Sequence, residues 1–168
     1  MSASGRVRIL LPFVVVVAGL AACGAGGPAV PGVSADFRLE ALDGGRLGPP
    51  DFPGEVVVVD FWATWCVPCR AQAAILEELH ADYRDRGVRF LAVDVAEDRE
   101  TVESFVAENP FPYPVLLDPE DRLSIELGLI ALPTVMVVDT EGEVVYLEAG
   151  LVDRRRLEKL LRQAGARA

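Results

Sequence analysis

The feature that most constrains the fold is a pair of cysteines, Cys66 and Cys69, placed where a buried strand ends and a helix begins. Residues 56–59 are four consecutive valines, and such a run is typical of a strand buried on both faces, as in a parallel sheet. After the cysteines, apolar residues recur at the spacing of a helix: Ala71, Ile75 and Leu79. The sequence therefore predicts that Cys66 opens an amphipathic helix directly after a core strand.

The rest of the chain alternates between strand and helix patterns. A hairpin is expected over 36–47, around an Asp-Gly-Gly turn at 43–45. Further strands are expected over 88–95, 113–117, 134–138 and 142–149, and helices over 98–108, 120–127 and 151–163. Alternating strands and helices indicate one layered α/β domain, with no internal repeat and no second domain.

The position of the two cysteines indicates a reactive pair. The first turn of a helix carries unpaired N–H groups and partial positive charge, which stabilise a thiolate, and the thiolate is the nucleophilic form. Two intervening residues bring both sulfur atoms to this turn, where Pro68 fits because its missing N–H is not needed. We expect Cys66 to be exposed and to attack first, and Cys69 to be shielded and to resolve a mixed disulfide.

Two other interpretations of the pair stay open: a purely structural disulfide, and half of a zinc site. A zinc site needs further ligands, but the chain has one histidine, His80, and one other cysteine, Cys23. His80 belongs to no motif and is expected to point to solvent. No metal and no cofactor are expected.

The first 22 residues have the order of a secretory signal: a short basic region with Arg6 and Arg8, an apolar stretch over 9–22, and small residues at its end. The stretch is shorter than the roughly 20 residues that a membrane-spanning helix needs. It ends in Leu-Ala-Ala-Cys at Cys23, which resembles the lipobox of bacterial lipoproteins. The resemblance implies cleavage before Cys23 and a diacylglycerol on its thiol. An ordinary signal peptide cut nearby, or an uncleaved anchor, is the alternative.

This interpretation divides the chain into a signal peptide (1–22), a flexible tether of small residues (23–33) and a single domain (34–168). The net charge is −10, and it becomes −12 without the leader, whose only charged residues are Arg6 and Arg8. Such an acidic chain lacks the basic surface that nucleic acid requires, and it has no Lys/Arg cluster for anionic lipid. We expect no nucleic-acid partner, and contact with a membrane through the lipid anchor.

The run from Asp60 to Cys69, Asp-Phe-Trp-Ala-Thr-Trp-Cys-Val-Pro-Cys, resembles the motif of the thioredoxin superfamily and of its TlpA/ResA branch. The resemblance covers about residues 34–165 and includes the helix-and-strand insert of that branch at 96–118. It implies a thioredoxin-like fold: a central mixed sheet flanked by helices, with an N-terminal β-hairpin and the insert. It also implies that Pro133 has a cis peptide bond and packs beside the cysteines. A partner would then contact four residues: Trp65, Pro68, Leu132 and Thr134.

Asp60 lies six residues before Cys66, at the end of the predicted strand, so its carboxyl should be partly buried and its pKa raised. In thioredoxins an aspartate in this place relays protons to the resolving cysteine, and we assign that role to Asp60 as a hypothesis. The alternative is an exposed acid at a strand end. ResA-like proteins use instead a glutamate three residues after the second cysteine. That position here is Gln72, which does not titrate.

The resemblance implies an extracytoplasmic, membrane-anchored thiol–disulfide oxidoreductase that reduces disulfides in secreted clients, often apocytochromes c or copper-site proteins. A membrane thiol-electron transporter would re-reduce it, and we expect a monomer. The residues between the cysteines, Val67 and Pro68, add no cation, which also favours a reductant.

Two alternatives from other functional classes fit the sequence less well. Peroxidases of the same fold place a proline and a threonine before a single reactive cysteine, with the threonine three residues upstream. Here Thr64 is two residues before Cys66, and the spaced proline is absent. Copper-handling lipoproteins have Cys-x-x-x-Cys-Pro and a distal histidine, and this chain has neither pattern.

Overall fold

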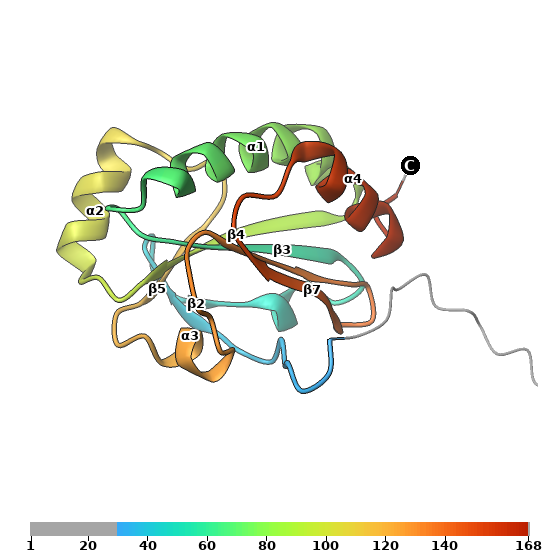
Figure 1. Ribbon diagram of the computed structural model, residues 1–168, viewed down its shortest axis with the longest axis horizontal. Coiled ribbons are helices and arrows are strands. Elements are labelled where there is room, and N and C mark those ends of the chain that lie inside the picture. The colour runs from blue at the N-terminus through green and yellow to red at the C-terminus, as the bar shows by residue number, and fades with distance from the viewer. Residues whose placement is uncertain (1–29, 168) are drawn as a thin grey trace, which may run out of the picture.

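A seven-stranded sheet organises the part of the chain that the computed structural model describes, residues 30–167 (Figure 1). The signal peptide, Cys23 and most of the tether lie outside the described residues. The strand order is β2-β1-β5-β4-β3-β6-β7. The strands are β1 (Leu39–Ala41), β2 (Arg46–Leu47), β3 (Val56–Trp62), β4 (Val88–Val95), β5 (Val115–Asp118), β6 (Thr134–Val138) and β7 (Val144–Ala149). The helices are α1 (Val67–Tyr83), α2 (Arg99–Glu108), α3 (Arg122–Glu126) and α4 (Arg154–Gln163), with short 3-10 turns at Pro49–Asp51 and Arg84–Arg86.

The sheet is mixed, as expected. Strands β3, β4 and β5 run parallel to one another, whereas β6 pairs antiparallel with β3, and β1 pairs antiparallel with β5. Every residue of β3 is buried, because neighbouring strands cover both edges and side chains cover both faces. The four-valine run therefore marks the middle of the molecule, as the sequence predicts.

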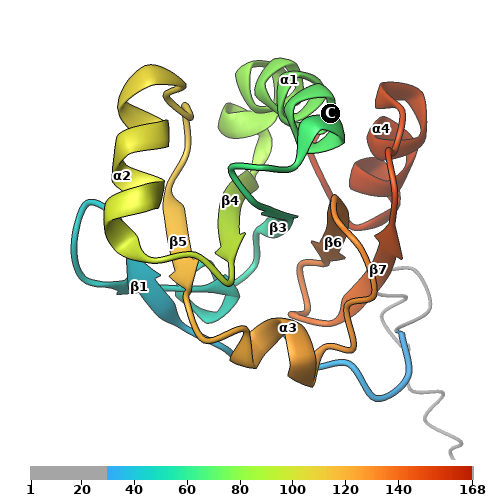
Figure 2. The same cartoon turned by 60° about the vertical axis from the view of Figure 1, so that its left-hand side comes forward.

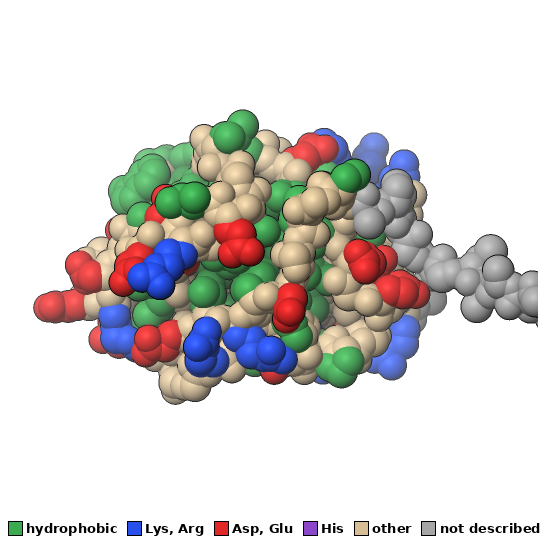
Figure 3. Space-filling model, turned by 90° about the horizontal axis from the view of Figure 1, so that it is seen from below, with side chains coloured by type: hydrophobic (Ala, Val, Ile, Leu, Met, Phe, Trp, Pro, Cys, Tyr) green, Lys and Arg blue, Asp and Glu red, His purple; other side chains and the backbone are tan. Residues whose placement is uncertain are grey.

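Helices cover the two faces of the sheet unequally. Figure 2 shows α1, α2 and α4 on one face and α3 on the other. Core residues of the first face include Leu76, Leu79 and Leu157, and those of the second include Leu91, Leu116 and Leu123. Figure 3 shows the molecule from below, where acidic and basic side chains surround apolar ones. Within residues 30–167, no helix is long and apolar enough to cross a membrane.

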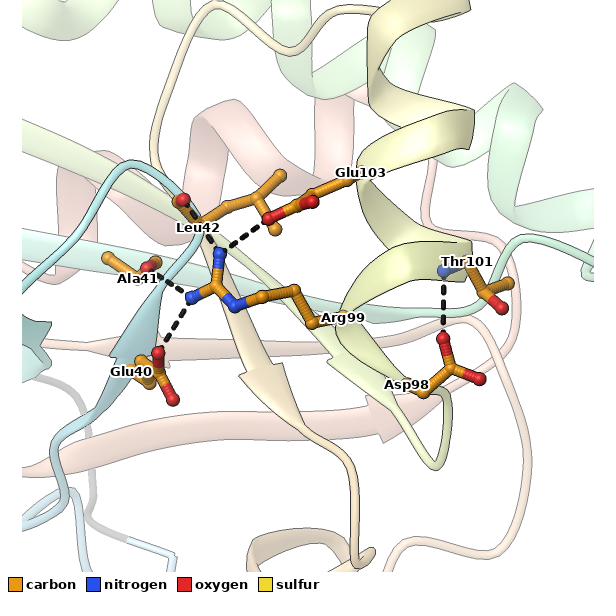
Figure 4. A network of polar contacts seen from close by, with 7 residues as sticks. All are labelled: Glu40, Ala41, Leu42, Asp98, Arg99, Thr101 and Glu103. Atoms are coloured by element: carbon orange, nitrogen blue, oxygen red, sulfur yellow. Dashed lines mark hydrogen bonds and ion pairs between the residues drawn. The ribbon is translucent and has the colours of Figure 1, made fainter.

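The insert is joined to the N-terminal hairpin both by a strand and by an arginine. β5 lies between β1 and β4, so the insert connects the hairpin with the central strands. Arg99, at the start of α2, binds the hairpin and its own helix (Figure 4). Its guanidinium contacts Glu40 at 2.7 Å, Glu103 at 2.8 Å, and the backbone oxygens of Leu42 and Ala41 at 3.0 and 3.2 Å. The Asp98 carboxylate accepts a bond from the Thr101 N–H at 2.9 Å and caps α2.

Several elements begin later than the sequence predicts, and prolines or capping side chains account for each starting position. β5 begins at Val115, because prolines at 112 and 114 supply no N–H for strand pairing. α3 begins at Arg122, where the Asp118 carboxylate accepts bonds from the N–H groups of its first turn. α4 begins at Arg154, after the capping residue Asp153.

Candidate active site

Cys66 and Cys69 form a disulfide at the start of α1. The S–S distance is 1.98 Å and the Cα–Cα distance is 5.3 Å. Cys66 is the N-cap residue of the helix, and Pro68 lies in its first turn. The local sequence produces this arrangement because β3 ends at Trp62, a short turn follows, and Pro68 favours the start of a helix.

Exposure does not distinguish the two cysteines, contrary to our expectation that Cys66 is exposed. Each is 3% exposed. Position in the helix separates them instead: Cys66 precedes the first turn, whereas Cys69 lies within it and donates its N–H to the Cys66 carbonyl at 3.2 Å. Both cysteines belong to the same buried cluster as Trp62 and Ala63, which accounts for their low exposure.

A pocket of about 220 Å³ opens beside the disulfide, and the insert forms one wall of it. Trp62 lies under this wall, with ring centroids 5.3 Å from Phe105 and 4.8 Å from Phe111. Arg70 of α1 places its guanidinium 5.6 Å from the Phe105 ring centroid. Residues 109–111, which lie between the predicted helix over 98–108 and the predicted strand over 113–117, also line the pocket.

The loop before β6 lies at the same end of the sheet as the disulfide-bearing segment. The Leu132–Pro133 peptide bond is cis, as the resemblance implies. Thr134 pairs with Phe61 in the sheet, near the end of β3, and its hydroxyl donates to the Ala131 carbonyl at 2.7 Å. This register places Pro133 at the same end of the sheet as the cysteines.

Large apolar side chains are exposed in the segments at this end of the sheet. Trp65 is 69% exposed, and Val67 in the same segment is 74% exposed. Ile130, shortly before the cis-proline, is 90% exposed. Leu151 is 58% exposed and follows β7, whose last residue, Ala149, pairs with Thr134 at this end of the sheet. Single exposed apolar side chains are ordinary on proteins, but several of them gathered at one end of a sheet, beside a disulfide, are suited to contact another protein.

Asp60 lies inside β3 and not at its end, because the strand continues to Trp62. Its side chain is 1% exposed, and neither oxygen has a hydrogen-bond partner among residues 30–167. Burial raises its pKa from 3.8 to about 8. Burial also raises the pKa of Tyr113, and the Asp60 charge adds to that shift. The alternative of an exposed strand-end acid is wrong.

Gln72 has a structural explanation that the sequence did not reveal. Its side chain is completely buried, accepts a bond from the Val152 N–H at 2.8 Å and donates to the Val152 carbonyl at 3.4 Å. These contacts join α1 to the loop before α4. An amide suits this position because it both donates and accepts.

His80 does not point freely to solvent as expected. Its ring is partly buried and makes edge contacts with Phe90 and Tyr113, at centroid distances of 5.6 and 5.5 Å. Burial, followed by the nearby positive charge of Arg84, lowers its pKa. Within residues 30–167, no group of three or more histidines, cysteines or acids is arranged to hold a metal ion.

Sequence reasoning missed two acids beside the motif, Asp94 and Glu97. The Glu97 carboxylate accepts bonds from the N–H and the hydroxyl of Thr64, each at 2.6 Å. Asp94 is completely buried at the end of β4, opposite Trp62. The sequence did contain a signal for Asp94, because this acid interrupts the apolar run of β4. The parallel strand β3 ends beside it, just before the cysteine motif.

Comparison with known proteins places this site in a family. The Redoxin family profile matches residues 25–161. The thiol-disulfide oxidoreductase ResA of Bacillus thuringiensis subsp. konkukian is 31% identical over 128 residues, which cover 76% of this chain and 74% of the relative.

Solved structures of thiol–disulfide exchange proteins have a similar fold. One named as a thiol:disulfide interchange protein DsbE from Chlorobium tepidum has a TM-score of 0.73 and 28% identity, and the match covers 82% of this chain and 99% of that one. The exposed lipoprotein thioredoxin of Streptococcus pneumoniae has a TM-score of 0.69 and 27% identity, covering 77% of this chain and 99% of that one.

Proposed function

Because the chain belongs to the Redoxin family and is a thiol–disulfide oxidoreductase of the thioredoxin type, we propose that it reduces disulfides of secreted client proteins from a membrane tether. The observation that carries the proposal is the Cys66–Cys69 disulfide at the N-terminus of α1, at the same end of the sheet as cis-Pro133 and several exposed apolar side chains. This end combines a reactive pair with a surface that a protein can contact.

The reaction has two exchange steps. The Cys66 thiolate attacks one sulfur of the client disulfide, forming a mixed disulfide and releasing the other client sulfur as a thiolate. The Cys69 thiolate then attacks the Cys66 sulfur, which forms the Cys66–Cys69 disulfide and releases the second client thiolate. The client gains two electrons and the pair loses two. A membrane thiol-electron transporter returns the pair to the dithiol form.

Asp60 is the proposed proton acceptor for Cys69. A pKa of about 8 allows its carboxyl to take up and release a proton near neutral pH. Gln72 occupies the place of the alternative acid, but its side chain has no titrating group and is engaged with Val152.

The proposed client surface consists of the segments around the disulfide. Trp65 and Pro68 are exposed in the segment that carries the disulfide, and Leu132, before the cis-proline, is half-buried. Thr134 is only 1% exposed, so the expectation that a partner contacts its side chain is wrong. Secreted proteins with an accessible disulfide, including the cytochrome c precursors that the resemblance implies, are the proposed clients. One chain contains the whole site, so a monomer is sufficient.

The geometry of the N-terminus supports a tether through Cys23. Val30 donates its N–H to the carbonyl of Val144, at the start of β7. Val144 pairs with Val138, and Val138 pairs with Val57 near the start of β3. The cysteines follow the other end of β3, so Val30 lies at the opposite end of the sheet. The chain therefore enters the described domain at the end of the sheet opposite the start of α1, so a tether that precedes Val30 would not have to cross the cysteines. Figure 1 shows the first described residues and the start of α1 apart from each other.

Reduction of insulin by the purified protein with dithiothreitol tests the activity. We expect turnover by the wild type, none by Cys66→Ser, and unchanged turnover by Glu103→Gln, a matched surface variant remote from the sulfurs. Turnover that persists in Cys66→Ser contradicts the proposal, and thiol-dependent consumption of hydrogen peroxide in place of insulin reduction supports the peroxidase alternative. Incorporation of labelled fatty acid into the wild type but not into Cys23→Ser tests the anchor separately.

A further inference from the structure

Glu97, near the start of the insert, holds the turn between β3 and α1. Its carboxylate accepts two bonds of 2.6 Å from Thr64, one from the backbone N–H and one from the hydroxyl. Each carboxylate oxygen accepts one of them, so a single side chain binds both donors of Thr64. Hydrogen bonds to a carboxylate are about twice as strong as those between neutral groups. Both residues are partly buried, which limits competition from water.

The turn that Glu97 holds carries the groups that meet a client. The Cys66 N–H donates to the Ala63 carbonyl at 3.0 Å, so these two residues close a turn with Thr64 inside it. The next residue, Trp65, is 69% exposed, and Cys66 is the N-cap of α1. A side chain that fixes Thr64 therefore also fixes where the chain leaves the sheet and where Cys66 meets the helix.

Glu97 is itself fixed by backbone contacts on both sides. The preceding residue, Ala96, donates its N–H to the carbonyl of Asp118 in β5 at 3.0 Å, and the following residue, Asp98, caps α2. Ala96 also has a φ of +64°, in the left-handed region that residues other than glycine rarely adopt. Such conformations cluster where a functional geometry is held. The acid thus stands between a paired strand and a capped helix, which defines its reach to Thr64 before any client binds.

Thiol–disulfide exchange depends on this geometry, because the attacking sulfur must line up with a sulfur of the other disulfide. A misplacement of about 1 Å can lower the rate of a reaction by about 100-fold. We propose that Glu97 is a positioning residue for the exchange: through Thr64 it keeps Cys66 at the N-terminus of α1, where the sulfur can attack. The exchange steps themselves are unchanged, because Glu97 acts through Thr64 alone. Only the assignment of Cys66 as the attacking thiol rests on the proposed function.

Rates with two substrates separate positioning from a purely structural contact. Reduced protein is mixed with insulin, a protein client, or with oxidised glutathione, a small disulfide. In Glu97→Ala both rates should fall by about tenfold, because each reaction needs Cys66 in place. The matched control Glu100→Ala, which removes an exposed acid from the first turn of α2, should keep both rates. Wild-type rates in folded Glu97→Ala overturn the proposal, and so does a loss confined to insulin, which would assign the contact to Trp65.

Variants of Thr64 provide a finer comparison. Thr64→Ser keeps both donors, whereas Thr64→Val, of nearly the same shape, removes only the hydroxyl. We expect Thr64→Ser to retain the wild-type rates and Thr64→Val to lower them by a smaller factor than Glu97→Ala does. Because the two residues act through shared bonds, the loss caused by Glu97→Ala should be smaller when Thr64→Val is already present. Losses that simply multiply, as they do for independent sites, overturn the proposal.

Two measurements decide the matter if Glu97→Ala does not fold. Equal rates for Thr64→Ser and Thr64→Val overturn the proposal. In the wild type, the Thr64 N–H should exchange with solvent more slowly than an exposed amide in both the oxidised and the reduced protein, and exposed-amide exchange in the reduced protein also overturns it. Failure of the wild type to reduce insulin would refute the proposed function, but the glutathione rates would still test Glu97, so the two failures are distinguishable.

Discussion

Replacement of Asp60 by asparagine should stabilise the protein increasingly as the pH rises. The carboxyl is 1% exposed, without a hydrogen bond among residues 30–167, and its folded-state pKa is about 8 against 3.8 in the unfolded chain. Between these values the folded state holds a proton that the unfolded state has lost, so rising pH favours unfolding. The effect is about 1.4 kcal/mol per pH unit, or about 3 kcal/mol between pH 5 and pH 7.

Urea denaturation of the oxidised protein at pH 5, 6 and 7 measures this effect. The free energy of unfolding of Asp60→Asn should rise relative to that of the wild type by about 3 kcal/mol across the range. Asp94 contributes equally to both proteins and cancels in the difference. The exposed variant Asp43→Asn should parallel the wild type. A difference between wild type and Asp60→Asn that stays constant with pH would refute a buried, proton-bearing Asp60.

Three further predictions concern individual contacts. Cys69→Ser should accumulate a mixed disulfide between Cys66 and a client, visible by non-reducing electrophoresis, because the resolving thiol is absent; release at the wild-type rate would contradict the assignment. Gln72→Ala should lower the free energy of unfolding by about 3 kcal/mol in urea, because a cavity forms and the Val152 N–H loses its partner. Trp65→Ala should lower kcat/KM for insulin but not the rate with oxidised glutathione, and equal losses would argue against a client-binding role.

Local sequence signals predicted the elements that carry the site. The valine run placed β3, the spacing of Ala71, Ile75 and Leu79 placed α1, and the hairpin turn placed β1 and β2. These patterns are reliable because each depends on a short stretch of chain with one period. The cis peptide at Pro133 was expected only from the family resemblance and is present.

Contacts between distant segments could not be predicted in the same way. Thr64 and Glu97 are separated by 33 residues, and Gln72 and Val152 by 80, so no local period relates them. The burial of Cys66 was missed because helix position alone does not show that this residue joins the buried cluster that contains Trp62 and Ala63. His80 was assigned to solvent because no motif includes it, although aromatic rings from β4 and from the loop before β5 pack against it.

The reduction potential of the Cys66–Cys69 couple tests most directly the claim that this chain is a reductant of client disulfides. It can be measured by equilibrating the purified protein with dithiol and disulfide buffers and counting free thiols. Val67 and Pro68 add no cation between the cysteines, so the thiolate form receives no extra stabilisation from them. We predict a potential near that of thioredoxin, about −270 mV, whereas a value near about −120 mV, typical of a strong oxidant, would contradict the account.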